Sequence, residues 1–240
     1  MWMQIEVLII PQVSGNWEMF EKRVVVLDVL RATSTIVTAL GNKALEVIPT
    51  IETDEAIELA RRLGNSECVT GGERKGLKIT GFDLGNSPLE YTPAKVAGKK
   101  VILSTTNGTR AIKSTQGASE VLIASFLNLQ VVVDYLKETN QDTLVICSGR
   151  NNYLSLEDLA CAGMIIEKLQ NEVLIDQETD ATKLAHYVWK NAQNDLEGFI
   201  CSTQHGSYLK EIGMEADLMA CIAFDKIPIL PRYQNGKISL

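Results

Sequence analysis

One short apolar run of the chain ends in an acid. Residues 24–27 are three valines and a leucine, which is typical of a strand buried on both faces, because a half-exposed strand would alternate apolar and polar residues. Asp28 follows directly, and an unpaired buried carboxylate is costly. We therefore expect a metal ion, a basic partner or a proton beside Asp28. Arg31 is one candidate partner, and the alternative is a buried Asp28–Arg31 pair that only fixes a turn.

A helix is expected after this strand. Ala32-Thr33-Ser34-Thr35 supplies hydroxyl groups at its beginning, residues 36–40 continue its apolar face, and Gly41 ends it. This order places an acid beside free backbone N–H groups at the carboxyl end of a strand. That is the usual ligand position in open α/β sheets.

The same order of strand, polar loop and helix occurs twice more. The strand at 101–103 precedes a turn in which Gly108 lets the backbone turn and Arg110 can fork onto an oxyanion. The strand at 143–147 precedes a loop that contains Ser148 and Arg150, and a helix capped by Ser155 then runs to about residue 169. Because the spacing of a P-loop is absent, nucleotide binding is not supported. The candidate substrate contacts of the first turn are Thr105, Thr106, Asn107, Gly108 and Thr109.

The remaining pattern alternates strands with helices. We expect an edge strand over residues 4–10, a loop over 11–18, a strand over 44–48 ended by Pro49, a helix over 53–63 capped by Thr53, a strand over 121–126, a helix over 129–138, helical structure over 179–211 and a hairpin turn over 233–237. This alternation predicts a layered α/β/α fold with a largely parallel or mixed sheet. Residues 1–240 would form a single domain, or two closely packed lobes.

Residues 71–93 are rich in glycine and show no sustained period, so they predict a long ordered loop. Within it Glu73 is a candidate metal ligand, Arg74 an anion contact, and Asn86 and Ser87 polar lining. The alternative is a surface excursion with ordinary solvated charges.

Charge and cysteine usage narrow the function. The net charge of −7 argues against a general nucleic-acid or membrane-surface role. Four arginines nevertheless lie in polar loops and suggest a small anionic ligand, namely Arg31, Arg74, Arg110 and Arg150. The five cysteines lack a CxxC pair and read as reduced core residues. With no signal segment and no apolar run long enough to cross a bilayer, we expect a cytoplasmic protein.

Three further residues have ambiguous roles. Glu157 and Asp158 begin a helix, where acids often serve the helix dipole, but they also follow a strand-end loop and could reach a cation shared with Asp28 and Glu73. His205, beside Ser202 and Gly206, is better placed for function than His186, which we interpret as a packing or surface residue.

These motifs together resemble the 2-phosphosulfolactate phosphatase family. The match spans nearly the whole chain and rests on DVLRAT (28–33), GGERKGLKITGFDLGNSP (71–88), TTNGTR (105–110), SLEDLACAG (155–163) and STQHG (202–206). The resemblance implies a Mg²⁺-dependent phosphatase that converts 2-phospho-3-sulfolactate and water into 3-sulfolactate and phosphate, on a route to coenzyme M. It also implies an α/β fold particular to the family and a homodimer. Arg150 is carried over less firmly than Arg74 or Arg110.

The residue chemistry agrees with such a substrate, whose three anionic groups would suit several guanidinium groups and helix N-termini. Asp28 and Glu73 are the first choices for Mg²⁺, with Glu157 or Asp158 as a third ligand. Asp28 is either a nucleophile or a metal ligand, and the missing DxDxT pattern favours the ligand role. His205 is a candidate proton donor. The expected catalytic set is Asp28, Arg31, Glu73, Arg110 and His205.

Two alternatives stay open at this point. The first is a phosphatase that acts on another 2-hydroxy-acid phosphate or small phosphomonoester. The second is a metabolite-binding protein without turnover, which would gain nothing from acids beside an anionic ligand.

Overall fold

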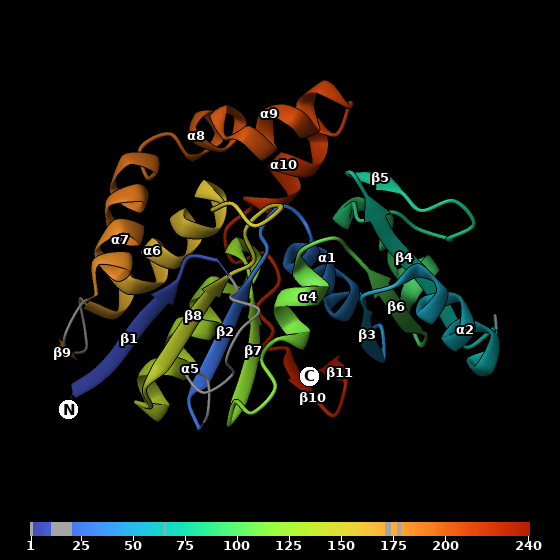
Figure 1. Cartoon of the computed structure of the whole chain (residues 1–240), viewed down its shortest axis with the longest axis horizontal. Coiled ribbons are helices and arrows are strands. Elements are labelled where there is room, and N and C mark those ends of the chain that lie inside the picture. The colour runs from blue at the N-terminus through green and yellow to red at the C-terminus, as the bar shows by residue number, and fades with distance from the viewer. Residues whose placement is uncertain (1, 11–20, 65, 171–173, 177–178) are drawn as a thin grey trace.

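The computed structural model describes residues 2–10, 21–64, 66–170, 174–176 and 179–240, so the loop expected over 11–18 lies outside the described residues. The described strands form one mixed sheet in the order β5-β4-β6-β3-β11-β10-β7-β2-β8-β1-β9 (Figure 1). Their bounds are β1 Trp2–Leu8, β2 Arg23–Leu27, β3 Glu46–Thr50, β4 Cys68–Arg74, β5 Leu77–Lys78, β6 Lys100–Ser104, β7 Glu120–Ala124, β8 Thr143–Cys147, β9 Leu174–Asp176, β10 Arg232–Gln234 and β11 Lys237–Ser239.

Two groups of parallel strands make up most of this sheet. In one group β7, β2, β8, β1 and β9 are parallel, and in the other β3, β6 and β4 are parallel. The C-terminal hairpin β10–β11 lies between the groups. β10 is antiparallel to β7, β11 is antiparallel to β10, and β3 is antiparallel to β11. The two groups therefore run in opposite senses along the sheet. The pairing of β10 with β7 and that of β11 with β3 each consist of one residue pair, Arg232↔Leu122 and Ile238↔Val47 respectively. Such short pairing lets the sheet turn sharply at the hairpin.

Helices cover both faces of the larger group, and between the groups lie α1 and α4 (Figure 1). Val25 and Leu27 of β2 pack in one core with α5, α6 and α7, whereas Val24 and Val26 pack in a second core with α1 and α4. The layered α/β/α prediction is therefore confirmed. The helices are α1 Ala32–Gly41, α2 Thr53–Leu63, α3 Pro93–Val96, α4 Gly108–Lys113, α5 Leu129–Thr139, α6 Leu156–Gln170, α7 Asp180–Ala192, α8 Leu196–Ser202, α9 Gln204–Glu211 and α10 Glu215–Cys221.

Several predictions of local structure were wrong. The strand expected over residues 4–10 is present as β1, but it is not the outermost strand, because its residues 2–4 pair with β9. Pro49 lies inside β3 rather than ending it, and Glu52, not Thr53, precedes α2 as its N-cap. Residues 71–74 and 77–78 are strands within the expected loop.

The helical stretch at 179–211 also divides differently. The side chains of Thr179, Asp195 and Thr203 each accept a backbone N–H and begin a new helix, so three helices replace one. The expected terminal hairpin is present as β10–β11. Among the described residues, no helix is both long and apolar enough to cross a membrane.

Candidate active site

A cavity of about 560 Å³ opens where strands from both parallel groups end. Its walls come from the β2–α1 loop, the β4–β5 turn, the β6–α4 loop, the β8–α6 loop and helix α9. Loops at the ends of strands from both groups therefore line one space, although the groups run in opposite senses along the sheet. The lining residues are Asp28, Leu30, Arg31, Glu73, Arg74, Lys75, Gly76, Asn86, Thr105, Thr106, Asn107, Arg150, Asn151, His205 and Tyr208.

Asp28 lies at the inner end of this cavity and is 7% exposed. Its Oδ1 accepts the backbone N–H of Ala32 at 3.2 Å, so the carboxylate itself caps the beginning of α1. The hydroxyl groups expected to cap this helix have other partners: Thr33 Oγ1 accepts the Asp28 N–H, and Ser34 Oγ donates to the Val29 carbonyl. Burial raises the pKa of Asp28 to about 6, against the opposing charge of His205.

Gly108 allows the β6–α4 loop to reach this carboxylate. A Cβ atom at Gly108 would lie 2.5 Å from Asp28 Oδ2 and 2.5 Å from the Ala32 Cβ. Even the smallest side chain would therefore displace Asp28 or α1. Gly108 was expected to contact the substrate, but its role in the structure is this close approach.

Glu73 fixes the loops on the other side of the cavity. Its Oε2 accepts the Gly76 N–H at 2.7 Å, and its Oε1 accepts the Thr106 N–H at 2.8 Å. One buried carboxylate thus joins the β4–β5 turn to the β6–α4 loop. The charge of Glu73 also acts to raise the pKa of Asp28.

Helix α9 brings His205 into the cavity. Its Nδ1 lies 3.3 Å from Oε1 of the buried Glu157 on α6. Burial alone would raise the pKa of Glu157, but the hydrogen bond and charge of His205 outweigh it and hold that pKa below its usual value. Glu157 therefore orients the ring of His205.

Asp158 does not line this cavity. Its Oδ1 accepts the Val29 N–H at 2.8 Å and its Oδ2 accepts the Ser148 hydroxyl at 3.1 Å, so it ties α6 to the ends of β2 and β8. Burial and the charges of Asp28 and Glu157 raise its pKa well above the usual range. The structure thus gives Asp158 a bracing role, and Ser148 is its partner rather than a residue of the cavity wall.

The four loop arginines have very different surroundings. Arg74 lines the cavity, but its Nη1 and Nη2 donate to Glu73 O, Ser104 O, Ile51 O and Ser104 Oγ. Arg150 has its guanidinium carbon 4.7 Å above the Tyr208 ring and donates once, to Gln204 O at 3.4 Å. Arg31 donates to Asp217 and to the Gly76 carbonyl. Within the described residues, Arg31 and Arg150 therefore keep more N–H groups without a partner than Arg74.

Arg31 does not pair with Asp28, contrary to one reading of the sequence, because its Nη1 lies 2.6 Å from Asp217 Oδ2. Arg110 was expected to fork onto the substrate, but its side chain is exposed and outside the cavity wall. The short helix α4 directs it to the outer surface. The structure therefore does not place Arg110 in the wall of this cavity.

Two other residues that were expected to contact the substrate bond to protein groups instead. Ser87 is buried and donates to Asp217 Oδ1, and Thr109 is buried and bonded to Thr105. Sequence reasoning gave no site role to five lining residues, which are Leu30, Lys75, Gly76, Asn151 and Tyr208. Lys75 and Gly76 stand in the same glycine-rich stretch as Glu73, and this position was the available signal. Tyr208 carried no signal, because α9 approaches the β4–β5 turn only in the folded chain.

The cavity offers oxygen donors suited to a hard cation. Asp28 and Glu73 line it, and the buried Asn86 Oδ1 and Thr106 Oγ1 have no hydrogen-bond partner among the described residues. Among the described residues no three His, Cys, Asp or Glu side chains are grouped to hold a metal. Mg²⁺ is commonly held by one or two carboxylates plus water, so this donor set fits it. Glu157, which bonds His205, and Asp158 lie outside the cavity wall.

Comparison with known proteins gives the family. The model of the 2-phosphosulpholactate phosphatase family matches residues 9–236. A relative from Caldanaerobacter subterraneus subsp. tengcongensis, called a probable 2-phosphosulfolactate phosphatase, is 44% identical over 90% of this chain and 89% of its own length. The chain belongs to this phosphatase family. Proteins of the same name from Clostridium acetobutylicum and Clostridium perfringens strain SM101 are 39% and 42% identical, each over 98% of this chain and over 100% and 96% of their own lengths.

Membership of a phosphatase family makes the chain an enzyme that hydrolyses phosphoric monoesters. The cavity agrees with this chemistry. Four cationic side chains, Arg31, Arg74, Lys75 and Arg150, face two carboxylates there, so the lining favours an anion.

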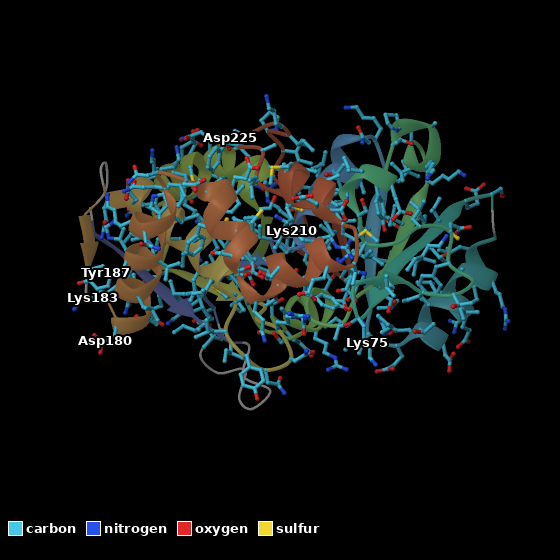
Figure 2. All side chains as sticks on the ribbon, turned by 90° about the horizontal axis from the view of Figure 1, so that it is seen from above. Lys75, Asp180, Lys183, Tyr187, Lys210 and Asp225 are labelled. Carbon is cyan, nitrogen blue, oxygen red and sulfur yellow. The ribbon has the colours of Figure 1, made fainter. Side chains whose placement is uncertain are left out.

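The raised pKa of Asp28 predicts a pH-dependent cost in stability. The folded protein holds this proton more tightly than the unfolded chain, so the free energy of unfolding falls as pH rises from about 4 to about 6 and stays lowered above. In chelator, Asp28→Asn should therefore be more stable than wild type by about 1–3 kcal/mol near neutral pH and equal to it at about pH 4. Denaturant unfolding at several pH values measures this difference. The exposed Asp180→Asn (Figure 2) is the control, and a difference independent of pH would contradict the prediction.

The unequal placement of the arginines predicts unequal kinetic losses. Arg31→Lys keeps a charge in the cavity but removes the planar fork, so kcat/KM should fall by about tenfold or more. Arg110→Lys, at an exposed position outside the cavity, should change kcat/KM by less than about twofold. Steady-state phosphate release by the two variants tests this. A larger loss in the Arg110 variant would return that residue to the site.

Proposed function

We propose that this protein is a Mg²⁺-dependent phosphatase that hydrolyses 2-phospho-3-sulfolactate to 3-sulfolactate and phosphate, a step on a route to coenzyme M. The observation that carries the proposal is one cavity with four cationic side chains around two carboxylates. A substrate with a phosphate, a carboxylate and a sulfonate needs several separate cationic contacts. The names of the relatives support the same substrate.

The cationic side chains come from different sides of the cavity. Arg31 follows β2, Lys75 lies in the β4–β5 turn and Arg150 follows β8. One guanidinium can hold the phosphoryl group while the others bind the two acid groups of the substrate. Asn107 and Asn151 complete the wall, and Asn107 Oδ1 accepts the Asn151 N–H at 3.2 Å, which links two of these loops.

Asp28 and Glu73 would hold Mg²⁺, together with Asn86 Oδ1 and Thr106 Oγ1 as neutral oxygens. When bound, the metal would neutralise charge on the transferring phosphoryl group. We favour this role for Asp28 over that of a nucleophile. Two nearby carboxylates gain from one shared cation, and the DxDxT pattern of aspartyl-phosphate enzymes is absent.

His205 is the proposed proton donor. Water attacks phosphorus, the bond between phosphorus and the ester oxygen breaks, and the leaving alkoxide takes a proton from the imidazolium of His205. The buried Glu157 carboxylate stabilises that imidazolium through its contact at 3.3 Å. In this arrangement the proposed proton donor is oriented by a second residue.

The second candidate function is hydrolysis of another 2-hydroxy-acid phosphate by the same machinery. A binding protein without turnover is disfavoured, because buried carboxylates beside an anion weaken its binding unless a cation accompanies them. We further propose a cytoplasmic homodimer. All five cysteines are free, which suits a reducing compartment, and light scattering coupled to size exclusion would test the dimer.

The first test is phosphate release from a panel of 2-phospho acids with and without Mg²⁺. We expect 2-phospho-3-sulfolactate to give the highest kcat/KM, EDTA to abolish turnover, and added Mg²⁺ to restore it. Substrates that lack the sulfonate or the carboxylate separate the two candidate functions. Full activity in chelator would reject the metal proposal while leaving the phosphatase assignment intact.

A second test separates the two roles of Asp28. As a metal ligand, Asp28→Asn keeps one coordinating oxygen without charge, so high Mg²⁺ should recover part of the lost rate. As a nucleophile, the amide could not attack, and no Mg²⁺ concentration would help. Trapping the wild-type reaction with borohydride gives the complementary readout, because an acyl phosphate would leave a reduced residue at position 28. A trapped adduct there would overturn the proposed ligand role.

A further inference from the structure

An acid on helix α10 lies directly behind Arg31. Asp217 is 3% exposed, its Oδ2 accepts from Arg31 Nη1 at 2.6 Å, and its Oδ1 accepts from Ser87 Oγ at 2.6 Å. Arg31 Nη2 donates to the Gly76 carbonyl, also at 2.6 Å. Two fixed acceptors on different Nη atoms determine both the position and the plane of the guanidinium group.

These contacts leave part of Arg31 available for a ligand. A guanidinium has five N–H groups, and within the described chain Arg31 uses two of them. The residue is 3% exposed yet belongs to the cavity wall, so it is little hydrated by bulk water and available to an anion that enters the cavity. A planar fork recognises an oxyanion only in the right orientation, and Asp217 supplies one of the two contacts that set it.

The same segment that carries Asp217 also completes the cavity. Helix α9, one short turn earlier in the chain, contributes His205 and Tyr208, and the Tyr208 hydroxyl donates to the Lys75 carbonyl at 2.8 Å. In the view from above, helix α9 is marked by Lys210 and crosses the centre of the molecule. The label of Lys75 marks the β4–β5 turn (Figure 2). Asp217 is thus one of several anchors that hold this helical segment over the strand ends.

We propose that Asp217 is a positioning residue for catalysis, which acts by orienting the guanidinium of Arg31 toward the phosphoryl group. This inference rests on the proposed function of the cavity. Asp217 makes no contact with the cavity itself, so its effect on turnover passes through Arg31. Such a residue differs from one that only stabilises α10, because its removal costs activity only while Arg31 is present.

The test is a double-mutant cycle with kcat, KM and melting temperature measured for each protein. Asp217→Ala should lower kcat/KM by about 10–100-fold when Arg31 is present, since a small misplacement of a positioned group costs that much. In an Arg31→Lys background, the same substitution should cost less than about threefold, because the fork is already lost. Asp217→Asn keeps the shape and one acceptor oxygen, and we expect a loss of about 3–10-fold, again only with Arg31.

Leu218→Ala is the matched control, because Leu218 is the next residue of α10 and is fully buried in the core. It should lower the melting temperature at least as much as Asp217→Asn while changing kcat/KM by less than about twofold in both backgrounds. If Asp217→Ala does not fold, the Asn variant carries the cycle alone.

Two results would overturn the inference. The first is a folded Asp217→Asn with kcat/KM within about twofold of wild type, and the second is an equal loss in the wild-type and Arg31→Lys backgrounds. Wild-type protein that releases phosphate from another phosphomonoester, but not from 2-phospho-3-sulfolactate, would refute the proposed substrate. The cycle would then be measured with that other ester, so the two failures are distinguishable.

Discussion

The buried carboxyl group of Asp28 is the constraint on which the site depends. It stands at the end of a strand whose five residues are all buried, where a charge without partners is strongly disfavoured. Two groups stabilise the charged form of Asp28, namely one backbone N–H at the beginning of α1 and the charge of His205. Gly108 leaves the space that the β6–α4 loop needs to approach the carboxylate. The effect of burial is larger than the effect of these groups, and the pKa of Asp28 rises to about 6. A bound cation would offset the cost of burying this charge, and this supports the proposed metal role of Asp28.

The second requirement is that two sets of strand ends meet. The parallel groups run in opposite senses along the sheet, and a flat sheet would place their carboxyl ends on opposite edges. The C-terminal hairpin lies between the groups and forms one strand-ladder pair with each, and pairing this short permits a sharp turn. Asp28 from one group and Glu73 from the other can then line one cavity.

The charged residues around the cavity have two different roles: some connect loops to one another, and others present donors to the cavity. Glu73, Arg74 and Asp158 bond mainly to backbone groups or hydroxyls of neighbouring loops, so much of their contribution is to hold strand ends together. Arg31, Arg150 and His205 keep N–H groups that have no partner among the described residues, and they contact Asp217, Tyr208 and Glu157 respectively. Each of these three contacted residues lies on a helix, and only Glu157 was considered for the site beforehand.

The sequence by itself determined the fold class, the strand–loop–helix units and most of the residues that line the cavity. These follow from local patterns, since apolar runs define the strands and polar residues at their ends define the loops. It did not determine which arginine faces the ligand, or that Arg31 pairs with Asp217 rather than Asp28. Such choices depend on side chains that are distant in sequence, such as the partners at 31 and 217, and only the docking of α9 and α10 over the strand ends brings them into contact. An acid next to apolar residues is visible in the sequence at both 28 and 217, but this pattern alone could not say which of the two would line the cavity.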